Sequence, residues 1–500
     1  MSILPLFVAI PLGGAFLTAL LGRRFKIVAH VLPNIATASL TVLSIVSLFI
    51  VKENGLVIYK MGGWMPPIGI SLILDGFSSF MLVTVNLIAF FVCLYSVNYM
   101  EQYTAKWKFF TLFLLMVTGM NGVVITGDLF NLYVFLEIAA IASYALVAFG
   151  IQHEELEASF KYAIMGSVAS TFILLGIIFL YSYTSTLNMA DMSRALLLKG
   201  PNNIVNYVLP LFFLGFGLKA ALVPFHAWLP DAHPSAPAPI SAMLSGVLIK
   251  ALGVYALCRI LYNVIGMDPK ISAILLFLGA LSMVVGVFLA IGQWDLKRLL
   301  AYHSISQIGY VILGIGLGTP LGVLGGLFHL FNHSIFKSLL FLNAGAVEHA
   351  TGTRDLKKMG GLMGKMPVTG VTSLFASLSI SGLPPFNGFW SKLIIIIAAV
   401  QAGRIGYASW AVLASILTLA SFAKVMKYGF YGNLKDNLAG VKDAPVFMKI
   451  SMVSLAFICL IGGVLIIPAV REGFLSLGSD ALLQGTRYFS IILQKTAGGM

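Results

Sequence analysis

The sequence predicts an all-α polytopic membrane protein with about fourteen transmembrane helices. Of its 500 residues, 59% are hydrophobic and 10% are charged, whereas a soluble domain carries about a quarter charged residues. Apolar runs of roughly 20 residues, the length that crosses a ~30 Å hydrocarbon core, recur from Ile3 to Ala469 with no long polar stretch between them. We therefore expect no extramembrane catalytic domain and assign no catalytic residue.

Each apolar run that is long enough to span the membrane marks one expected helix. The expected helices cover residues 3–21, 27–50, 73–99, 107–126, 129–150, 159–183, 204–228, 238–262, 270–291, 298–317, 320–344, 367–400, 404–431 and 446–469. The first run leads straight into Arg23, Arg24 and Lys26 and has neither a polar n-region nor a cleavage site. This pattern indicates a retained helix rather than a signal peptide.

Basic residues are divided unevenly between the two sets of alternating loops. The chain holds 31 Lys and Arg against 18 Asp and Glu, a net charge of +13. One set of loops holds Arg23, Arg24, Lys26, Lys106, Lys108, Lys297, Arg298, Arg354, Lys357, Lys358, Lys365, Lys435, Lys442 and Lys449. The other set holds Lys52, Lys60, Arg194, Lys199, Lys270 and Arg404. Because cytoplasmic loops are enriched in Lys and Arg, we expect both termini outside, and the positive charge does not require a nucleic-acid partner.

The cysteines and glycines exclude several kinds of chemistry. Cys93, Cys258 and Cys459 lie singly in separate apolar segments, whereas a disulfide framework, a thiolate zinc site or an iron–sulfur cluster needs several cysteines together. The segment GGLMGK at 360–365 lacks the first glycine and the following Ser or Thr of a P-loop. We therefore expect no metal, no redox cofactor and no ATPase activity in this chain.

Two of the expected helices are interrupted by proline and glycine. The run 204–228 continues into LVPFHAWLPDAHPSAPAPI, and the run 367–400 contains SGLPPFNGFWSK. Proline removes a backbone donor and opposes a continuous helix. Paired interruptions in corresponding positions of two halves point to an ion site in transporters, and the alternative is a pair of ordinary proline kinks.

The two interruptions lie about five expected helices apart, which suggests the domain organisation. A unit of five helices has an odd number of crossings, so a second such unit must be inverted relative to the first. We expect N-terminal helices at 1–106, inverted five-helix repeats at 107–265 and 266–432, and a last helix with an amphipathic tail at 433–500. The mixed apolar and polar residues of that tail are typical of an interfacial helix or a contact with a neighbouring subunit.

Glu137 is the clearest ionisable residue expected deep in the membrane, because it lies in the middle of LFNLYVFLEIAAIASYALVAF. A charge near the bilayer centre costs at least ~2.5–3.5 kcal/mol, so such a residue usually has a partner or a water path. Lys219 is the matching base, and a pair whose separation changes can switch proton affinity. Lys250 and Lys392 are expected to lie with this pair in a row of polar side chains along the midplane of the membrane. The alternatives are a structural hydrogen bond for Glu137 and snorkelling for the lysine.

His329, His333 and Lys337 are spaced four residues apart in GGLFHLFNHSIFKSLLFLNAG, so they stack along one helix face. Imidazoles that titrate near neutrality beside a lysine suit a proton relay. Two histidines at this spacing can also hold zinc, although no HExxH glutamate accompanies them. A packed polar stripe is the other alternative.

The secondary candidates are Lys161, His226, His303 and Lys424. Lys161 and His303 lie near helix ends, where snorkelling or a satisfied polar contact explains them as well as function does. His226, with Asp231 and His233 in the same interrupted run, would either gate access from the cytoplasmic side or cap helix ends.

Five segments of the chain, taken in order, resemble a known family. They are DLFNLYVFLEIAAIASYALVAFG, GFGLKAALVPFHAWLPDAHPSAPAPISAMLSG, AYHSISQIGY, LFHLFNHSIFKSLLFLNAGAV and SGLPPFNGFWSK. Together they resemble the antiporter-like membrane subunits of respiratory complex I and of Mrp-type multisubunit Na+/H+ antiporters. Within this family the chain is most similar to the Mrp D subunit and to the H-type subunit of membrane-bound energy-converting hydrogenases.

The resemblance implies a fourteen-helix core with two inverted five-helix repeats, in the cytoplasmic membrane of a prokaryote. The proton-translocation residues that it implies are Glu137, Lys219, Lys250, His329, His333, Lys337 and Lys392. In that interpretation Glu137 and Lys219 form an ion pair, Lys250 connects it to the histidine relay, and Lys392 is the terminal lysine.

Two functions are consistent with the resemblance. The first is proton translocation within an Mrp-type Na+(cation)/H+ antiporter; the second is H+ or Na+ pumping in a redox-driven complex such as a membrane-bound hydrogenase or a complex I-like oxidoreductase. The expected partners are antiporter-like and small hydrophobic membrane subunits, joined in the second case by a peripheral redox arm. Iron–sulfur or nickel–iron centres would belong to such partners. A scaffold with vestigial charges is the third alternative.

Overall fold

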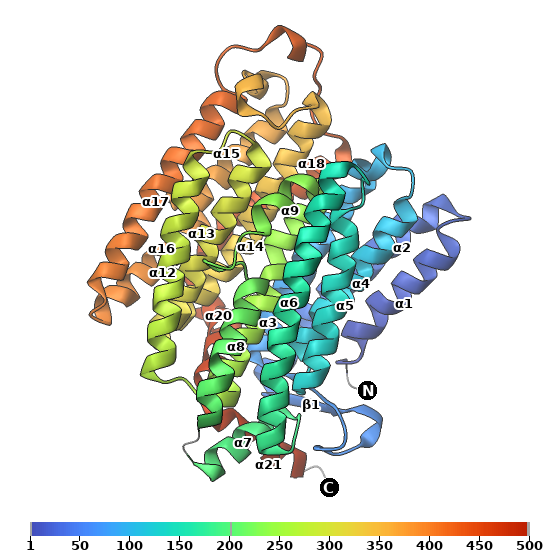
Figure 1. Cartoon of the computed structure of the whole chain (residues 1–500). Coiled ribbons are helices and arrows are strands. Elements are labelled where there is room, and N and C mark those ends of the chain that lie inside the picture. Colours follow the sequence, from blue (N-terminus) through green and yellow to red (C-terminus); the bar gives the residue numbers. More distant parts are fainter. Residues whose placement is uncertain (1–2, 201–202, 498–500) are drawn as a thin grey trace.

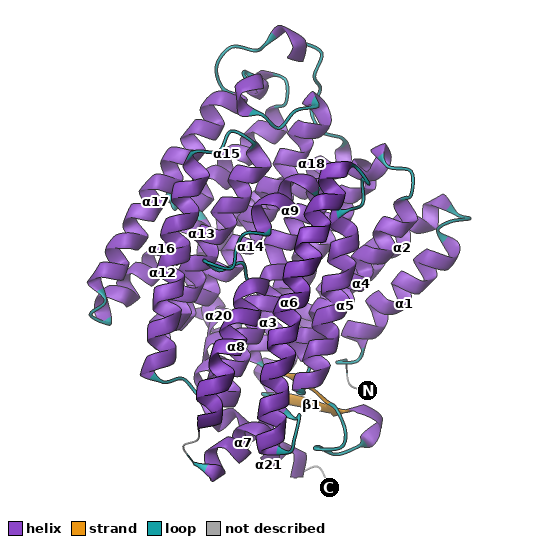
Figure 2. Ribbon diagram, viewed as in Figure 1, coloured by secondary structure: helices purple, strands orange, loops and turns teal. Residues whose placement is uncertain are grey.

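The computed structural model describes residues 3–200 and 203–497, and in this part the chain is a bundle of long helices with one short β-hairpin (Figures 1 and 2). Ten of the described helices are long and apolar enough to cross a membrane. Four shorter apolar helices accompany them, α1 (Leu6–Leu21), α8 (Asn203–Lys219), α15 (Pro367–Ser381) and α16 (Asn387–Gln401). The prediction of a helical polytopic membrane protein is confirmed.

The N-terminal part combines three long helices with the hairpin. The helices are α2 (Lys26–Asn54), α3 (Gly76–Tyr99) and α4 (Lys106–Ile125). Strand β1 (Val57–Lys60) pairs antiparallel with β2 (Ser71–Leu74). Asp75 then caps α3, because its carboxylate accepts the Ser78 N–H while the Ser78 hydroxyl accepts the Asp75 N–H. The sequence analysis predicted no hairpin here. The buried strand β2 of the hairpin overlaps the beginning of the predicted helix 73–99.

The middle part holds the first helix break. Its elements are α5 (Leu129–Val147), α6 (His153–Thr184), α7 (Met189–Lys199), α8, α9 (Leu229–Ser235), α10 (Ala238–Met243) and α11 (Ala256–Cys258). Helix α8 ends at Lys219 rather than at the predicted residue 228, and the chain becomes helical again at Leu229. From α10 the chain continues to Ile265 largely in π-helical turns, a wide geometry that often marks functional sites.

The second half holds the second break. Its elements are α12 (Pro269–Ile291), α13 (Leu296–Gly316), α14 (Pro320–Thr351), α15, α16, α17 (Ile405–Val425), α18 (Val446–Ile461), α19 (Pro468–Gly473), α20 (Leu475–Leu483) and α21 (Tyr488–Ala497). The break separates α15, which ends at Ser381, from α16, which begins at Asn387. Prolines in the interval explain why the helix does not continue.

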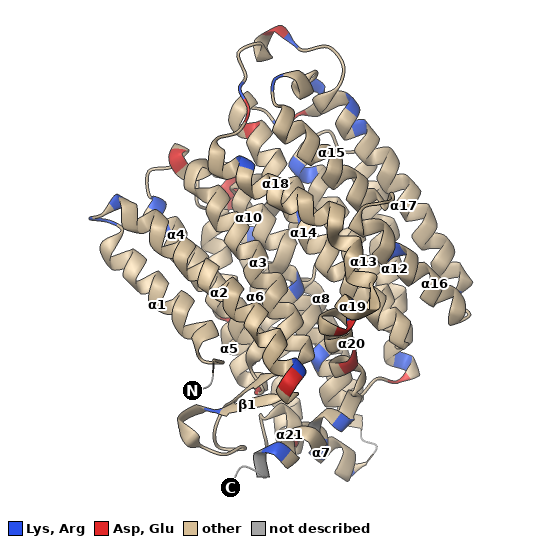
Figure 3. Cartoon of the chain, turned by 180° about the vertical axis from the view of Figure 1, so that it is seen from behind, with Lys and Arg blue, Asp and Glu red and all other residues tan. Residues whose placement is uncertain are grey.

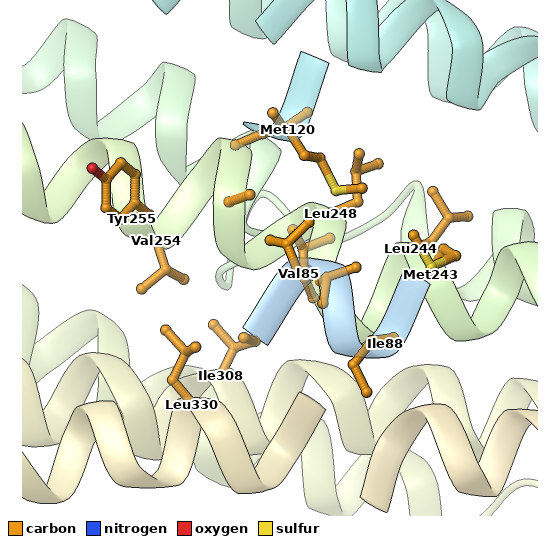
Figure 4. Close-up of a cluster of buried hydrophobic side chains, with 14 of the residues drawn as sticks. Val85, Ile88, Met120, Met243, Leu244, Leu248, Val254, Tyr255, Ile308 and Leu330 are labelled. Carbon is orange, nitrogen blue, oxygen red and sulfur yellow. The ribbon is translucent and has the colours of Figure 1, made fainter. Parts of the chain in front are cut away.

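The core lies around the π-helical segment that follows α10. The span Ala238–Ile265 is buried along its whole apolar window, so this segment has no lipid-facing side. Figure 4 shows its side chains Leu248 and Val254 among residues of α3, α4, α13 and α14, such as Val85, Met120 and Leu330. Figure 3 shows Lys, Arg, Asp and Glu gathered mostly at the two ends of the bundle, with a few Lys and Arg in its middle.

The two ends differ in the elements that form them. Figure 1 places β1, α7 and α21 at one end, together with both termini, and the loops before α15 and before α18 at the other. We call the latter the basic end, because these loops carry Arg354, Lys357, Lys358, Lys365, Lys435 and Lys442.

Candidate functional site

The ionisable side chains of the predicted proton path come from five elements, namely α5, α8, the continuation of α10, α14 and α16. Lys250, His329, His333 and Lys337 are completely buried, and Lys219 and Lys392 nearly so. Buried charges need partners or water. The contacts of each group therefore show what the arrangement can do.

The first group is an acid–base pair at the end of α8. Lys219 Nζ lies 3.6 Å from Glu137 Oε1, and Glu137 also accepts a hydrogen bond from the Ser170 hydroxyl. The Tyr144 hydroxyl is 3.4 Å from Lys219 Nζ. Because Lys219 is the last residue of α8, the helix dipole favours its positive charge there.

A small cavity of about 10 Å³ adjoins Lys219. Its walls include Tyr162, Trp228, Leu248 and Leu252. Trp228 is fixed by a 2.9 Å hydrogen bond to the backbone oxygen of the residue before Lys219 and by stacking on Tyr162. A cavity of this size holds about one water molecule, and it reaches the two leucines that flank Lys250.

Lys250 occupies the π-helical segment and donates to the backbone oxygens of Ser245 at 2.5 Å and Gly246 at 2.6 Å. Ser245 Oγ is 2.7 Å from Ser304 Oγ of α13. The Ser304 hydroxyl donates to the backbone oxygen of Leu300, to which Lys337 Nζ of α14 also donates at 2.5 Å. Two buried lysines on different helices are thus joined through the backbone oxygen and hydroxyl of Ser245, the hydroxyl of Ser304 and the Leu300 carbonyl.

The two histidines of α14 have different surroundings. His329 Nδ1 is 2.9 Å from Ser391 Oγ, and its Nε2 is 3.1 Å from Gln307 Oε1. His333 lies parallel to it, with 6.4 Å between ring centroids. Neither ring nitrogen of His333 has a partner among the described residues. Nor do three His, Cys, Asp or Glu side chains meet anywhere in that part of the chain as a metal site would require.

Lys392 lies at the second helix break. Its ammonium donates to the Ile380 backbone oxygen at 2.7 Å and contacts Ser415 Oγ at 3.3 Å. The Tyr310 ring lies 4.9 Å from Lys392 Nζ and 5.4 Å from the His329 ring. The break therefore leaves the Ile380 carbonyl free to accept a hydrogen bond from Lys392. The first break likewise lies beside a lysine, Lys219.

The secondary candidates occupy four different environments. Lys161 is half-exposed and pairs with Glu157 at 2.9 Å and Asp231 at 3.3 Å. His226 is partly buried. His303 is buried, with Nε2 2.8 Å from Ser421 Oγ. Lys424 donates to two backbone oxygens at the end of α12, both at 2.6 Å, so it serves as a helix cap.

An open cavity of about 340 Å³ lies at the basic end beside α9. The charged residues in its walls are Glu154, Glu157, Lys161, Asp231, Asp295, Arg298 and Arg354. We call this cavity the vestibule.

His233 lies on α9 and is completely buried, with its ring stacked on Phe341 of α14. Neither of its ring nitrogens has a partner in the described part of the chain.

Sequence reasoning missed two buried ion pairs. Arg259 binds Asp75 through two hydrogen bonds of 2.7 and 2.8 Å, and Lys297 lies 2.6 Å from Glu348. Arg259 stands in the apolar run 238–262, so the same cost argument that selected Glu137 could have found it. The expectation that Lys297 lies in a loop is wrong, because it lies in α13 and is buried.

The Asp75–Arg259 pair gives a prediction about stability. Arg259→Met should leave the Asp75 carboxylate buried without its counter-ion, which typically costs ~3–5 kcal/mol. We expect a clearly lower thermal midpoint for the purified complex. Arg298→Met, which removes an exposed partner of Asp231, should leave the midpoint nearly unchanged. Equal midpoints for the two variants would mean that water already compensates the buried pair.

Residues 126–418 match the family described as "NADH:quinone oxidoreductase/Mrp antiporter, TM", and residues 64–110 match "NADH-Ubiquinone oxidoreductase (complex I), chain 5 N-terminus". The D subunit of the Na+/H+ antiporter from Alkalihalophilus pseudofirmus is 32% identical over 486 residues, covering 96% of this chain and 97% of that protein.

Two solved structures have the same fold over nearly their whole length. A chain of the Mrp complex from a Dietzia species superposes with a TM-score of 0.90 at 28% identity, covering 98% of this chain and 99% of that chain. A chain of the membrane-bound sulfane sulfur reductase, an archaeal respiratory membrane complex, gives a TM-score of 0.88 at 31% identity with the same two coverages.

Proposed function

Since the chain belongs to the NADH:quinone oxidoreductase/Mrp antiporter transmembrane family, we propose that it is the proton-translocating subunit of a multisubunit Mrp-type cation/H+ antiporter. The observation that carries the proposal is the series of buried basic groups across the middle of the bundle. It begins at the Glu137–Lys219 pair and ends at Lys392.

In this proposal a proton enters from the vestibule at the basic end and passes along the series. When Glu137 lies against Lys219, the charged lysine is favoured; when they separate, the lysine in its apolar surroundings releases its proton. The cavity beside Lys219 offers room for a water that carries the proton toward Lys250. From there the serine bridge leads to Lys337, and the histidines of α14 lead to Lys392.

The membrane arrangement is part of the same proposal. Fourteen crossings result when α1, α8 and α14 are added to the ten long apolar helices and α15 and α16 count as two halves of one crossing. The repeats are residues 107–265 and 266–432, inverted relative to each other, between N-terminal helices at 1–106 and the tail at 433–500. The basic end faces the cytoplasm of a prokaryote, and both termini lie outside the cytoplasmic membrane.

A second function is favoured by the sulfane sulfur reductase likeness. In it the chain is the ion-pumping membrane subunit of a redox-driven complex, and the redox centres lie in partner subunits. The redox-driven complex would pump H+ or Na+. The antiporter would exchange H+ for Na+, and the Na+ path would lie on another subunit.

Mass spectrometry of the complex purified in a mild detergent distinguishes the two functions. Only small hydrophobic and antiporter-like chains are expected with the antiporter. Iron–sulfur, flavin or nickel-bearing chains would overturn the antiporter in favour of the redox-driven pump.

Lys161→Ala tests where the path begins. Lys161 is half-exposed and its partners reach solvent, so its charge contributes little in water. We expect proton movement to stay within about twofold of the parent. Complete loss of proton movement in Lys161→Ala would mean that Lys161 is part of the proton path. Lys219→Ala, measured in the same vesicles, should abolish movement.

A further inference from the structure

Helix α15 carries a row of hydroxyl side chains that the proposed path does not use. The row consists of Thr369, Ser373, Ser377 and Ser381, all buried. Their four-residue spacing places them along one side of the helix. Ser381 meets α17, because Ser415 Oγ donates to its backbone oxygen at 2.8 Å. Near the other end of α15, Gly370 lies against Phe430 beyond α17, so the two helices run in opposite directions.

Helix α17 has polar side chains at matching heights. A position one turn before Ser381 lies level with a position about one turn after Ser415. Thr418 and Ser421 occupy such positions, and both are buried. Ser421 in turn contacts His303 of α13. We call Thr369, Ser373, Ser377, Ser381, Thr418 and Ser421 the hydroxyl seam.

Two hydroxyls of the seam are unsatisfied. Ser373 Oγ and Ser377 Oγ have no hydrogen-bond partner within the described residues, although the side chains are only 4% and 3% exposed. The buried Nδ1 of His303 also has no hydrogen-bond partner within the described residues. A serine that is satisfied within its own helix donates to a carbonyl one turn earlier, as Ser381 does to the Ser377 oxygen at 2.6 Å. Unpaired buried hydroxyls instead require water, which usually satisfies such groups.

The seam joins two charged groups. At its inner end Lys392 donates to the Ile380 oxygen and contacts Ser415. At its outer end the Thr369 hydroxyl donates to Asp443 at 2.6 Å. Asp443 belongs to the loop before α18, which lies at the basic end in Figure 1.

We propose that the hydroxyl seam is a second proton path, in which water bridges Ser373 and Ser377 and connects the basic end at Asp443 with Lys392. It rests on the proposed function and adds to it an access route separate from the vestibule. Through this route Lys392 exchanges protons with the basic end without passing Lys219 or Lys250.

Thiol accessibility tests whether the seam holds water. Ser377→Cys in the complete complex is exposed to Ag+ and to a small cationic methanethiosulfonate in membrane vesicles. Ala376→Cys is the matched control, since it lies next to Ser377 on α15 but outside the row and is completely buried. The parent corrects for Cys93, Cys258 and Cys459, which are buried. We expect Ser377→Cys to react at least ~10-fold faster than Ala376→Cys. Equal rates would overturn the proposal.

Transport tests whether that water carries protons. Ser377→Val and Ser377→Thr differ from each other by one hydroxyl at nearly equal volume. Ser377→Val closes the seam but leaves the vestibule route open, so we expect it to lower proton movement by about half, and we expect Ser377→Thr to keep the parent rate. Full movement in Ser377→Val would overturn the path even if the thiol reacts. Glu137→Gln is measured beside them. If it is inactive while Ser377→Val is fully active, the seam alone is refuted, whereas full activity of Glu137→Gln refutes the role of the Glu137–Lys219 pair in the proposed function.

Discussion

Glu137→Gln is expected to abolish proton movement by the complete complex while leaving its assembly intact. Glutamine keeps the shape of the side chain and can still accept the hydrogen bond from Ser170. It removes the negative charge 3.6 Å from Lys219 Nζ. An uncharged partner cannot alternately hold and release the lysine charge, so the rate should fall by ~10-fold or more. Dye-reported pH changes in inside-out vesicles measure the rate.

Glu157→Gln is the matched control for this experiment. Glu157 also pairs with a lysine, but the pair lies in the open vestibule with both side chains about half-exposed. Its replacement should change the rate by less than about twofold. Undiminished transport in Glu137→Gln would mean that the buried carboxylate only joins α5 to α6 and α8, as a structural hydrogen bond would.

The sequence predicted the positions of the long helices because a membrane helix needs about 20 apolar residues and leaves an unambiguous run. It did not predict β1, β2 or α7. These elements are short, lie between the long runs and make contacts with distant segments, such as the hydrogen bond that Asn188, at the start of α7, donates to Ser71 of β2. Short segments of this kind leave too few residues for a periodic pattern.

The charged members of the site could be found from the sequence, and their connections could not. Glu137, Lys219 and Lys392 stood out because a charge is costly in an apolar run. The serines that bridge Lys250 and Lys337 gave no signal, since serine is common in membrane helices and costs little there. The π-helical turns around Lys250 pack against α4, α8 and α14, and the local sequence does not encode these distant contacts.

The break after α8 was predicted from the sequence, but its exact position was not. The prolines after Lys219 predicted an interruption, but α8 ends five residues before Pro224. Lys219 is therefore at a helix end rather than in mid-helix, where the apolar run alone would place it. The backbone at a helix end can shift without breaking the hydrogen bonds of a continuous helix, so the position favours the change of separation that we propose for Lys219 and Glu137.

Lys392→Ala and Lys392→Arg together test whether the last lysine gives up its proton. Alanine removes the ammonium that binds the Ile380 oxygen at the helix break. Arginine retains a positive charge and can still donate to that carbonyl, but it remains protonated in proteins. If Lys392 transfers protons, both variants should lose ~10-fold or more of the rate. If Lys392 is a fixed charge that holds α15 and α16 together, arginine should restore transport.

Lys424→Arg provides the matched control for the arginine substitution. Lys424 donates to the carbonyls of Ile291 and Gln293 at the end of α12, a capping role that arginine can fill. We expect Lys424→Arg to transport at nearly the parent rate, so a loss confined to Lys392→Arg reports the missing deprotonation and not the larger side chain. Because Lys392 is the group at which the α14 histidines and the hydroxyl seam meet, its failure should stop protons from both directions, whereas Ser377→Val should stop them only along the seam.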